Sequence, residues 1–256
     1  MQNIKKLILR RIHTSIHSVS LTLHRILSMI GHYAIQSFRV SRVAFMQRWM
    51  YREIILINLV ISCQANFTLM LNPEGDAKNA GRMLNDSFER GITLQFCNEL
   101  KKELEKRYKD LRVVLTRFPG ETIEYLQNAN FSNRLNADFY LSIHFFKENE
   151  VLPNLYIYYF VKEPFVVSTP LTLHFYPFDS AHLININKTI KYAESFRDRL
   201  SKNSNFKTNK ALGIPFKPLI GIIAPAIAIE AGIKDSESFK EYLEPVLEAI
   251  EAAFGK

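Results

Sequence analysis

The chain has 256 residues, of which 47% are hydrophobic, including 19 Phe and 11 Tyr. This is enough for one sizeable α/β domain, or for one domain with an extension. The net charge of +8 is concentrated at the start, because the first 52 residues carry nine Lys or Arg and no acidic residue. The remainder has 24 basic and 25 acidic residues, a net charge of −1, which argues against a nucleic-acid-binding domain. Two cysteines are too few for a disulfide framework.

Residues 1–45 are basic, rich in Ser and His, and free of acidic residues. This composition is typical of transit peptides and of amphipathic helices at membrane surfaces. We interpret the segment instead as an upstream extension of the domain or as a poorly ordered tail.

The segment that begins at Met46 has a short basic region, nine mostly apolar residues and then Cys63. It is too short to cross a bilayer and has the length of a signal-peptide apolar region. Val60-Ile61-Ser62-Cys63 resembles a bacterial lipobox, whose cysteine carries a lipid anchor, whereas Cys63-Gln64-Ala65 fits an ordinary cleavage site. A core strand is the alternative. We therefore predict a leader over residues 1–65 and an exported domain over residues 66–256.

The first half of this domain alternates between strand and helix patterns. Helical spacing places Ile92, Phe96, Leu100 and Leu104 on one face of a helix over residues 92–106. Apolar segments bounded by turn formers predict strands over 67–71, 112–117 and 138–144, and a second helix over 122–135. This order is typical of a parallel sheet with right-handed crossovers.

The second half continues the pattern. We expect a strand over 154–160, a long irregular connection over 161–186, a helix over 188–200, a polar loop over 201–210 and a strand over 224–230. Ser238 and Glu241 have the spacing of a capping box, and Pro245 suits the first turn of a final helix. The fold class is therefore α/β, as a single domain with a mostly parallel twisted sheet and helices on both faces.

Three polar residues stand where these elements begin or end. Glu89 precedes the first helix, and His144 and Glu230 each close an apolar strand. The carboxyl ends of strands are where α/β sheets place their ligands. A core histidine bonded to a backbone carbonyl is the alternative for His144.

Several stretches resemble the zinc-dependent N-acetylmuramoyl-L-alanine amidases, which hydrolyse peptidoglycan. The resemblance covers residues 67–254 and is carried by RVVLTR, NANFSNRLNADFYLSIH, NLYIYYF and KALGIPFKPLIGIIAPAIAIEAGIKDSES. It implies a zinc hydrolase of the bacterial cell envelope that cleaves the amide bond between N-acetylmuramic acid and L-alanine.

In that family a His, a Glu and a second His hold the zinc, and a later Glu acts on the water. The resemblance implies that Glu89 is the Glu ligand, His144 the second His ligand and Glu230 the catalytic carboxylate. Three protein ligands leave zinc one open position for a water of lowered pKa. The carboxylate would pass a proton from that water to the departing nitrogen.

The first ligand departs from the family pattern. The family has Asp-Pro-Gly-His-Gly-Gly after its first strand, whereas this chain has Asn-Pro-Glu-Gly-Asp-Ala over residues 72–77, so the His position falls on Gly75. Either Glu74 or Asp76 replaces the missing ligand, or His174 or His182 reaches in from the long connection. Otherwise the domain is an inactive pseudoamidase that binds peptidoglycan or regulates wall hydrolysis.

Overall fold

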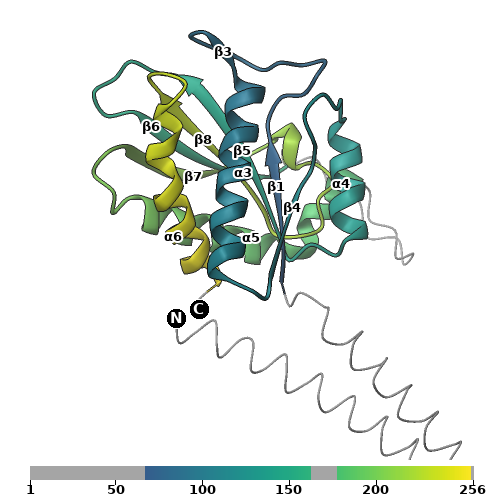
Figure 1. The fold of residues 1–256 in the computed structure, drawn as a ribbon. Helices are drawn as coiled ribbons and strands as arrows, with labels where there is room; N and C mark the ends of the chain where they lie inside the picture. The colour runs from purple at the N-terminus through teal and green to yellow at the C-terminus, as the bar shows by residue number, and fades with distance from the viewer. Residues whose placement is uncertain (1–66, 163–177, 255–256) are drawn as a thin grey trace, which may run out of the picture. The chain divides into compact units, whose positions relative to one another are not determined.

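The computed structural model describes residues 67–162 and 178–254 (Figure 1). The predicted leader, the lipobox cysteine Cys63 and His174 lie outside these residues. None of the helices within them is long and apolar enough to cross a membrane.

The described residues form a six-stranded sheet with the order β4-β1-β5-β8-β6-β7. Its strands are β1 (Phe67–Pro73), β4 (Leu111–Leu115), β5 (Phe139–Lys147), β6 (Asn154–Phe160), β7 (Lys207–Ile214) and β8 (Ala226–Ile233). All neighbouring pairs are parallel except β6 and β8, which are antiparallel. The prediction of a mostly parallel sheet is therefore confirmed. A short hairpin, β2 (Met83–Leu84) with β3 (Ser87–Phe88), lies outside the sheet.

Helices cover the two faces of the sheet unequally (Figure 1). The helices α3 (Glu89–Arg107), α5 (Ile186–Leu200) and α6 (Leu243–Phe254) pack on one face, over the larger hydrophobic cluster. The other face carries α4 (Tyr125–Arg134) and the 3-10 turns η1 (Phe178–Asn185) and η2 (Lys217–Leu219), over a smaller cluster. Helix α3 forms as its spacing predicts, because Ile92, Phe96, Leu100 and Leu104 are all buried against the sheet.

Three local predictions were wrong. Residues 207–210 belong to edge strand β7 and not to a loop, and β7 is polar and largely exposed, so it lacks the apolar alternation of an inner strand. Strands β5 and β8 continue three residues beyond His144 and Glu230. No capping box forms at Ser238: its backbone N–H and its hydroxyl both donate to Asp235, and the 3-10 turn η3 (Ser238–Tyr242) follows.

The alternation of side chains along the strands puts the polar residues on the less covered face. Tyr140 and Ala228 belong to the smaller cluster, so residues two or four positions further along β5 and β8 face the same way. His144 and Glu230 are therefore on this face, and they are also direct partners in the β5–β8 register.

Candidate functional site

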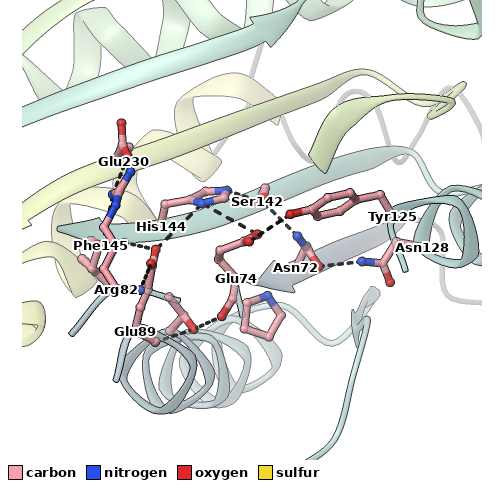
Figure 2. Close-up of polar contacts among 12 residues, drawn as sticks. Asn72, Glu74, Arg82, Glu89, Tyr125, Asn128, Ser142, His144, Phe145 and Glu230 are labelled. Atoms are coloured by element: carbon pink, nitrogen blue, oxygen red, sulfur yellow. Dashed lines mark hydrogen bonds and ion pairs between the residues drawn. The ribbon is translucent and has the colours of Figure 1, made fainter. Parts of the chain in front are cut away.

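His144 is buried in β5 with its two ring nitrogens in different surroundings (Figure 2). Its Nε2 lies 2.8 Å from the Ser142 hydroxyl. Its Nδ1 faces two carboxylates, 3.8 Å from Glu74 Oε2 and 3.9 Å from Glu89 Oε1. Burial, with a contribution from the positive charge of Arg82, lowers the pKa of His144 to about 3. The imidazole is therefore neutral at physiological pH, the state in which histidine binds metals.

Glu89 is the first residue of α3 and is almost completely buried. Its Oε1 accepts the backbone N–H of Phe145 at 3.1 Å, and its Oε2 accepts that of Arg82 at 3.0 Å. Burial raises the pKa of this carboxyl, and the two backbone donors act in the opposite direction. A side chain at Gly81 would meet Glu89 Oε2 at 2.9 Å, so the glycine makes room for this carboxylate.

Glu74 follows the end of β1, where its backbone N–H donates to the Ile143 carbonyl at 3.1 Å. Its Oε1 accepts the Tyr125 hydroxyl at 3.3 Å, which leaves Oε2 facing His144. Burial and the nearby charge of Glu89 raise the pKa of Glu74 to about 7. The structure therefore brings Glu74 together with Glu89 and His144.

The other substitutes named from the sequence are placed differently. Asp76 Oδ1 accepts the backbone N–H groups of Lys78 and Asn79, at 2.8 and 2.6 Å, and its Oδ2 accepts that of Ile123 at 3.3 Å. This carboxylate therefore stabilises its own loop. His182 lies in η1 and packs edge-on against the Phe160 ring, with centroids 4.7 Å apart.

Glu230 stands beside His144 on β8, and its carboxylate contacts the Arg82 side chain (Figure 2). Oε1 lies 2.6 Å from Arg82 Nη1, and Oε2 accepts the Tyr158 hydroxyl at 2.9 Å. Arg82 thus contacts Glu89 through its backbone and Glu230 through its side chain. Arg82 and Tyr158 were not predicted as site residues, since nothing in their local sequence pattern indicates contacts with residues so distant in the chain.

The donor set of Glu74, Glu89 and His144 has the chemistry of a divalent-metal site, with two carboxylate oxygens and one neutral imidazole. Ligands of a tetrahedral zinc with bonds of about 2.1 Å lie about 3.4 Å apart, so the separations of 3.8 and 3.9 Å are wider by a few tenths of an ångström. Among the described residues no group of three or more His, Cys, Asp or Glu forms a preformed metal site. The two carboxylates and the imidazole are ligand types that zinc accepts, and zinc binding would shorten the distances between them.

Comparisons with family models, curated proteins and solved structures all indicate the same family. A family model described as N-acetylmuramoyl-L-alanine amidase matches residues 70–247. The N-acetylmuramoyl-L-alanine amidase CwlM of Bacillus licheniformis is 25% identical over 147 residues, which are 57% of this chain and 53% of that protein. The chain thus spans about half the length of this curated relative.

Solved structures of amidases share the fold. An N-acetylmuramoyl-L-alanine amidase from Clostridium difficile 630 matches with a TM-score of 0.53 and 18% identity, covering 75% of this chain and 95% of that one. AmiC2 of Nostoc punctiforme matches with a TM-score of 0.52 and 21% identity, over 75% and 96% of the two chains. Ami1 of Mycobacterium smegmatis matches with a TM-score of 0.53 and 13% identity, over 75% and 98%.

Proposed function

Because the chain belongs to the N-acetylmuramoyl-L-alanine amidase family, we propose that it hydrolyses the amide bond between N-acetylmuramic acid and L-alanine in peptidoglycan. The observation that supports this most directly is the convergence of Glu74, Glu89 and His144 beside Glu230. They come from the turn after β1, the first residue of α3, β5 and β8, and their side chains converge on one place (Figure 2).

In this proposal zinc is held by His144 Nδ1, Glu89 and Glu74, and Glu74 replaces the missing histidine. The metal would polarise the carbonyl of the scissile amide and acidify a water in its open position. The neutral imidazole and the hydrogen-bonded Glu89 are held in place without the metal, which reduces the reorganisation needed on binding.

Glu230 is the general base in this scheme. It takes a proton as the water oxygen attacks the amide carbon, and it gives a proton to the L-alanine nitrogen as the carbon–nitrogen bond breaks. Arg82 and Tyr158 keep its carboxylate in one orientation, and each carboxylate oxygen retains a lone pair for the proton.

The test combines zinc content with hydrolysis of purified peptidoglycan. The wild-type protein is expected to contain about one zinc per chain by elemental analysis and to release L-alanine amino groups from the wall. Glu230→Gln should lose about 10²-fold or more in rate while it keeps its zinc, whereas His144→Ala should lose both. Glu105→Gln, at an exposed position of α3, is the matched control. Undiminished hydrolysis by the Glu230 variant would remove its assigned role.

A second candidate function is a pseudoamidase that binds peptidoglycan or regulates wall hydrolysis without metal. It is favoured by Gly75 at the family's histidine position and by the absence of a preformed metal site among the described residues. A folded, zinc-free protein that sediments with cell-wall sacculi and releases no amino groups would support this alternative.

We also propose that residues 1–65 are a leader and that the protein is exported to the bacterial cell envelope. The apolar segment before Cys63 supports this interpretation. Mass spectrometry of the N-terminus of the protein from native cells tests it. Lipidated Cys63 would support a membrane anchor, cleavage near residue 65 would support a soluble exported form, and an intact Met1 would contradict export.

A further inference from the structure

Partly exposed aromatic side chains border Glu230 on the less covered face of the sheet. Tyr156 of β6 is the direct partner of Glu230 in the β6–β8 register, so the two side chains lie on the same face. Tyr158 lies two residues further along β6 and donates its hydroxyl to Glu230. Phe146 lies two residues beyond His144 on β5, on the same face as the histidine. All three aromatic residues are partly exposed.

These rings contact one another in a continuous row. The Phe146 and Tyr156 centroids are 6.1 Å apart, and so are those of Tyr156 and Tyr158, whose ring planes differ by only 4°. Phe216, between β7 and η2, extends the row, with its centroid 5.2 Å from that of Tyr158 and 5.0 Å from that of His144. The aromatic row of Phe146, Tyr156, Tyr158 and Phe216 therefore ends at the proposed metal ligand.

The edge of the aromatic row carries polar groups. Arg82 lies over the Phe146 ring, with its guanidinium carbon 5.9 Å from the centroid, and 52% of its side chain is exposed. A partly exposed apolar surface that is bordered by polar groups is typical of a ligand site. The chemistry of this surface fits a pyranose ring, which packs its C–H groups on aromatic rings and directs its hydroxyl groups at charged side chains.

The proposed substrate contains such a ring close to the bond that breaks. In peptidoglycan only a lactyl group separates the sugar ring of N-acetylmuramic acid from the carbonyl of the scissile amide. When that carbonyl lies beside His144 and Glu230, the sugar therefore has to contact the side chains directly around them. The sugar can lie on either side of β5, whose neighbours in the sheet are β1 and β8.

The two sides of β5 differ in chemistry. On the β1 side is a hollow whose lining is mostly polar or charged and includes Glu74, Arg117 and Tyr125. Figure 2 shows Tyr125 and Glu230 on opposite sides of His144. A polar lining suits the amide groups and charges of a peptide. On the β8 side is the aromatic row, which offers the apolar surface that a sugar ring needs.

We propose that the aromatic row binds the N-acetylmuramic acid ring of the glycan strand, so that the sugar lies over β8 and β6 and the stem peptide leads away towards β1 and α4. The inference rests on the proposed function, because it takes peptidoglycan as the substrate. It adds the orientation of that substrate in the site and assigns Tyr156 to sugar binding.

The experiment is a titration of the chelator-treated full chain with a peptide-free disaccharide, N-acetylglucosaminyl-N-acetylmuramic acid. NMR of protein labelled in its tyrosine rings follows the titration. The ring signals of Tyr156 and Tyr158 are expected to shift, whereas that of Tyr125, on the β1 side, should stay in place. A shift of Tyr125 alone, or of none of these three tyrosines, would overturn the inference.

Calorimetry with the same disaccharide measures what one ring contributes. Tyr156→Ala should weaken binding by about tenfold, the size of one lost aromatic contact. Tyr159→Ala is the matched control, because it removes a tyrosine from the opposite face of the same strand, where Tyr159 packs against the larger cluster. Equal affinities of Tyr156→Ala and the wild type would contradict the assignment. The wild-type spectra decide the matter even if the Tyr156 variant does not fold.

The outcomes separate this inference from the proposed function, since sugar binding is measured without zinc. Hydrolysis of peptidoglycan by a protein whose Tyr156 signal does not respond to the disaccharide would overturn the inference and leave the amidase intact. A shift of Tyr156 in a protein that hydrolyses no peptidoglycan would support the sugar site and contradict the proposed activity.

Discussion

At the residue scale, the site combines buried acids with a buried neutral base. Glu74 and Glu89 lie against His144, and burial raises the pKa of both carboxyls. Buried carboxyls of this kind lower the stability of the fold when they are charged. Groups with shifted pKa values are therefore found mostly at functional sites.

The raised pKa of Glu74 predicts how stability depends on pH in the zinc-free protein. Its carboxyl binds a proton more tightly in the folded chain, with a pKa of about 7, than in the unfolded chain, where the ordinary value is 4.5. The folded state is therefore favoured at low pH. Its free energy of unfolding should fall as the pH rises from about 4.5 to about 7, by up to about 3 kcal/mol. Urea unfolding at pH 5 and pH 8 measures the change.

Glu74→Gln is the matched control for this effect, because glutamine keeps the shape of the side chain and does not titrate. The variant should lose less stability between the two pH values than the wild type does. Equal losses in both proteins would mean that Glu74 does not titrate in this range.

At the element scale, the turn after β1 decides which residue can replace the missing histidine. Gly75 has a φ of +76°, and a Cβ there would lie 2.8 Å from the Arg90 Cβ. A side chain at Gly75 is therefore strained and crowded, whereas the side chain of Glu74 already points at His144.

This geometry predicts opposite results for two histidine substitutions. Gly75→His should destabilise the protein by about 1–3 kcal/mol without improving zinc binding. Glu74→His should keep the fold and bind zinc more tightly than the wild type, because imidazole suits zinc well. Thermal unfolding and zinc competition measure the two effects. Tighter zinc binding by the Gly75 variant would show that the loop can rearrange.

Helix α3 carries Glu89 at its first residue, so its packing holds one of the proposed ligands in place. Leu100, on the side of α3 that faces the sheet, is completely buried. Leu100→Ala should lower the free energy of unfolding by about 2–5 kcal/mol, because the deletion leaves a cavity. Leu126→Ala, at a side chain that is 53% exposed on α4, should change it by less than about 0.5 kcal/mol. Urea denaturation compares the two, and a similar loss in both would contradict this account of the core.

At the scale of the whole domain, the sheet is most protected at its centre. Strands β5 and β8 pair over eight residues and are buried almost throughout, whereas β7 is an exposed edge strand. Native-state hydrogen exchange should therefore be slowest in β5 and β8 and much faster in β7 and in the β2–β3 hairpin. Uniform protection along all strands would contradict this ranking.

The sequence by itself determined the α/β class, the mostly parallel sheet and helix α3, because these follow from local periodicity and from the alternation of elements. It also pointed to Glu89, His144 and Glu230 through their positions at element boundaries and the family resemblance, and their roles stay a prediction. Strand β7 escaped detection because an exposed edge strand needs no apolar pattern.

Only the tertiary structure decided which group faces His144 in place of a histidine. Glu74 and Asp76 are equally good candidates in the sequence. In the structure, the backbone hydrogen bond from Glu74 to Ile143 places the Glu74 carboxylate at the site, whereas the Asp76 carboxylate accepts hydrogen bonds from its own loop. The pair of Arg82 with Glu230 and the bond of Asn72 to Ser142 were likewise hidden. Each joins residues 70 or more positions apart. The β1–β5 register sets the contact of Asn72 with Ser142, and the path of the segment before β2 brings Arg82 to Glu230; local sequence encodes neither.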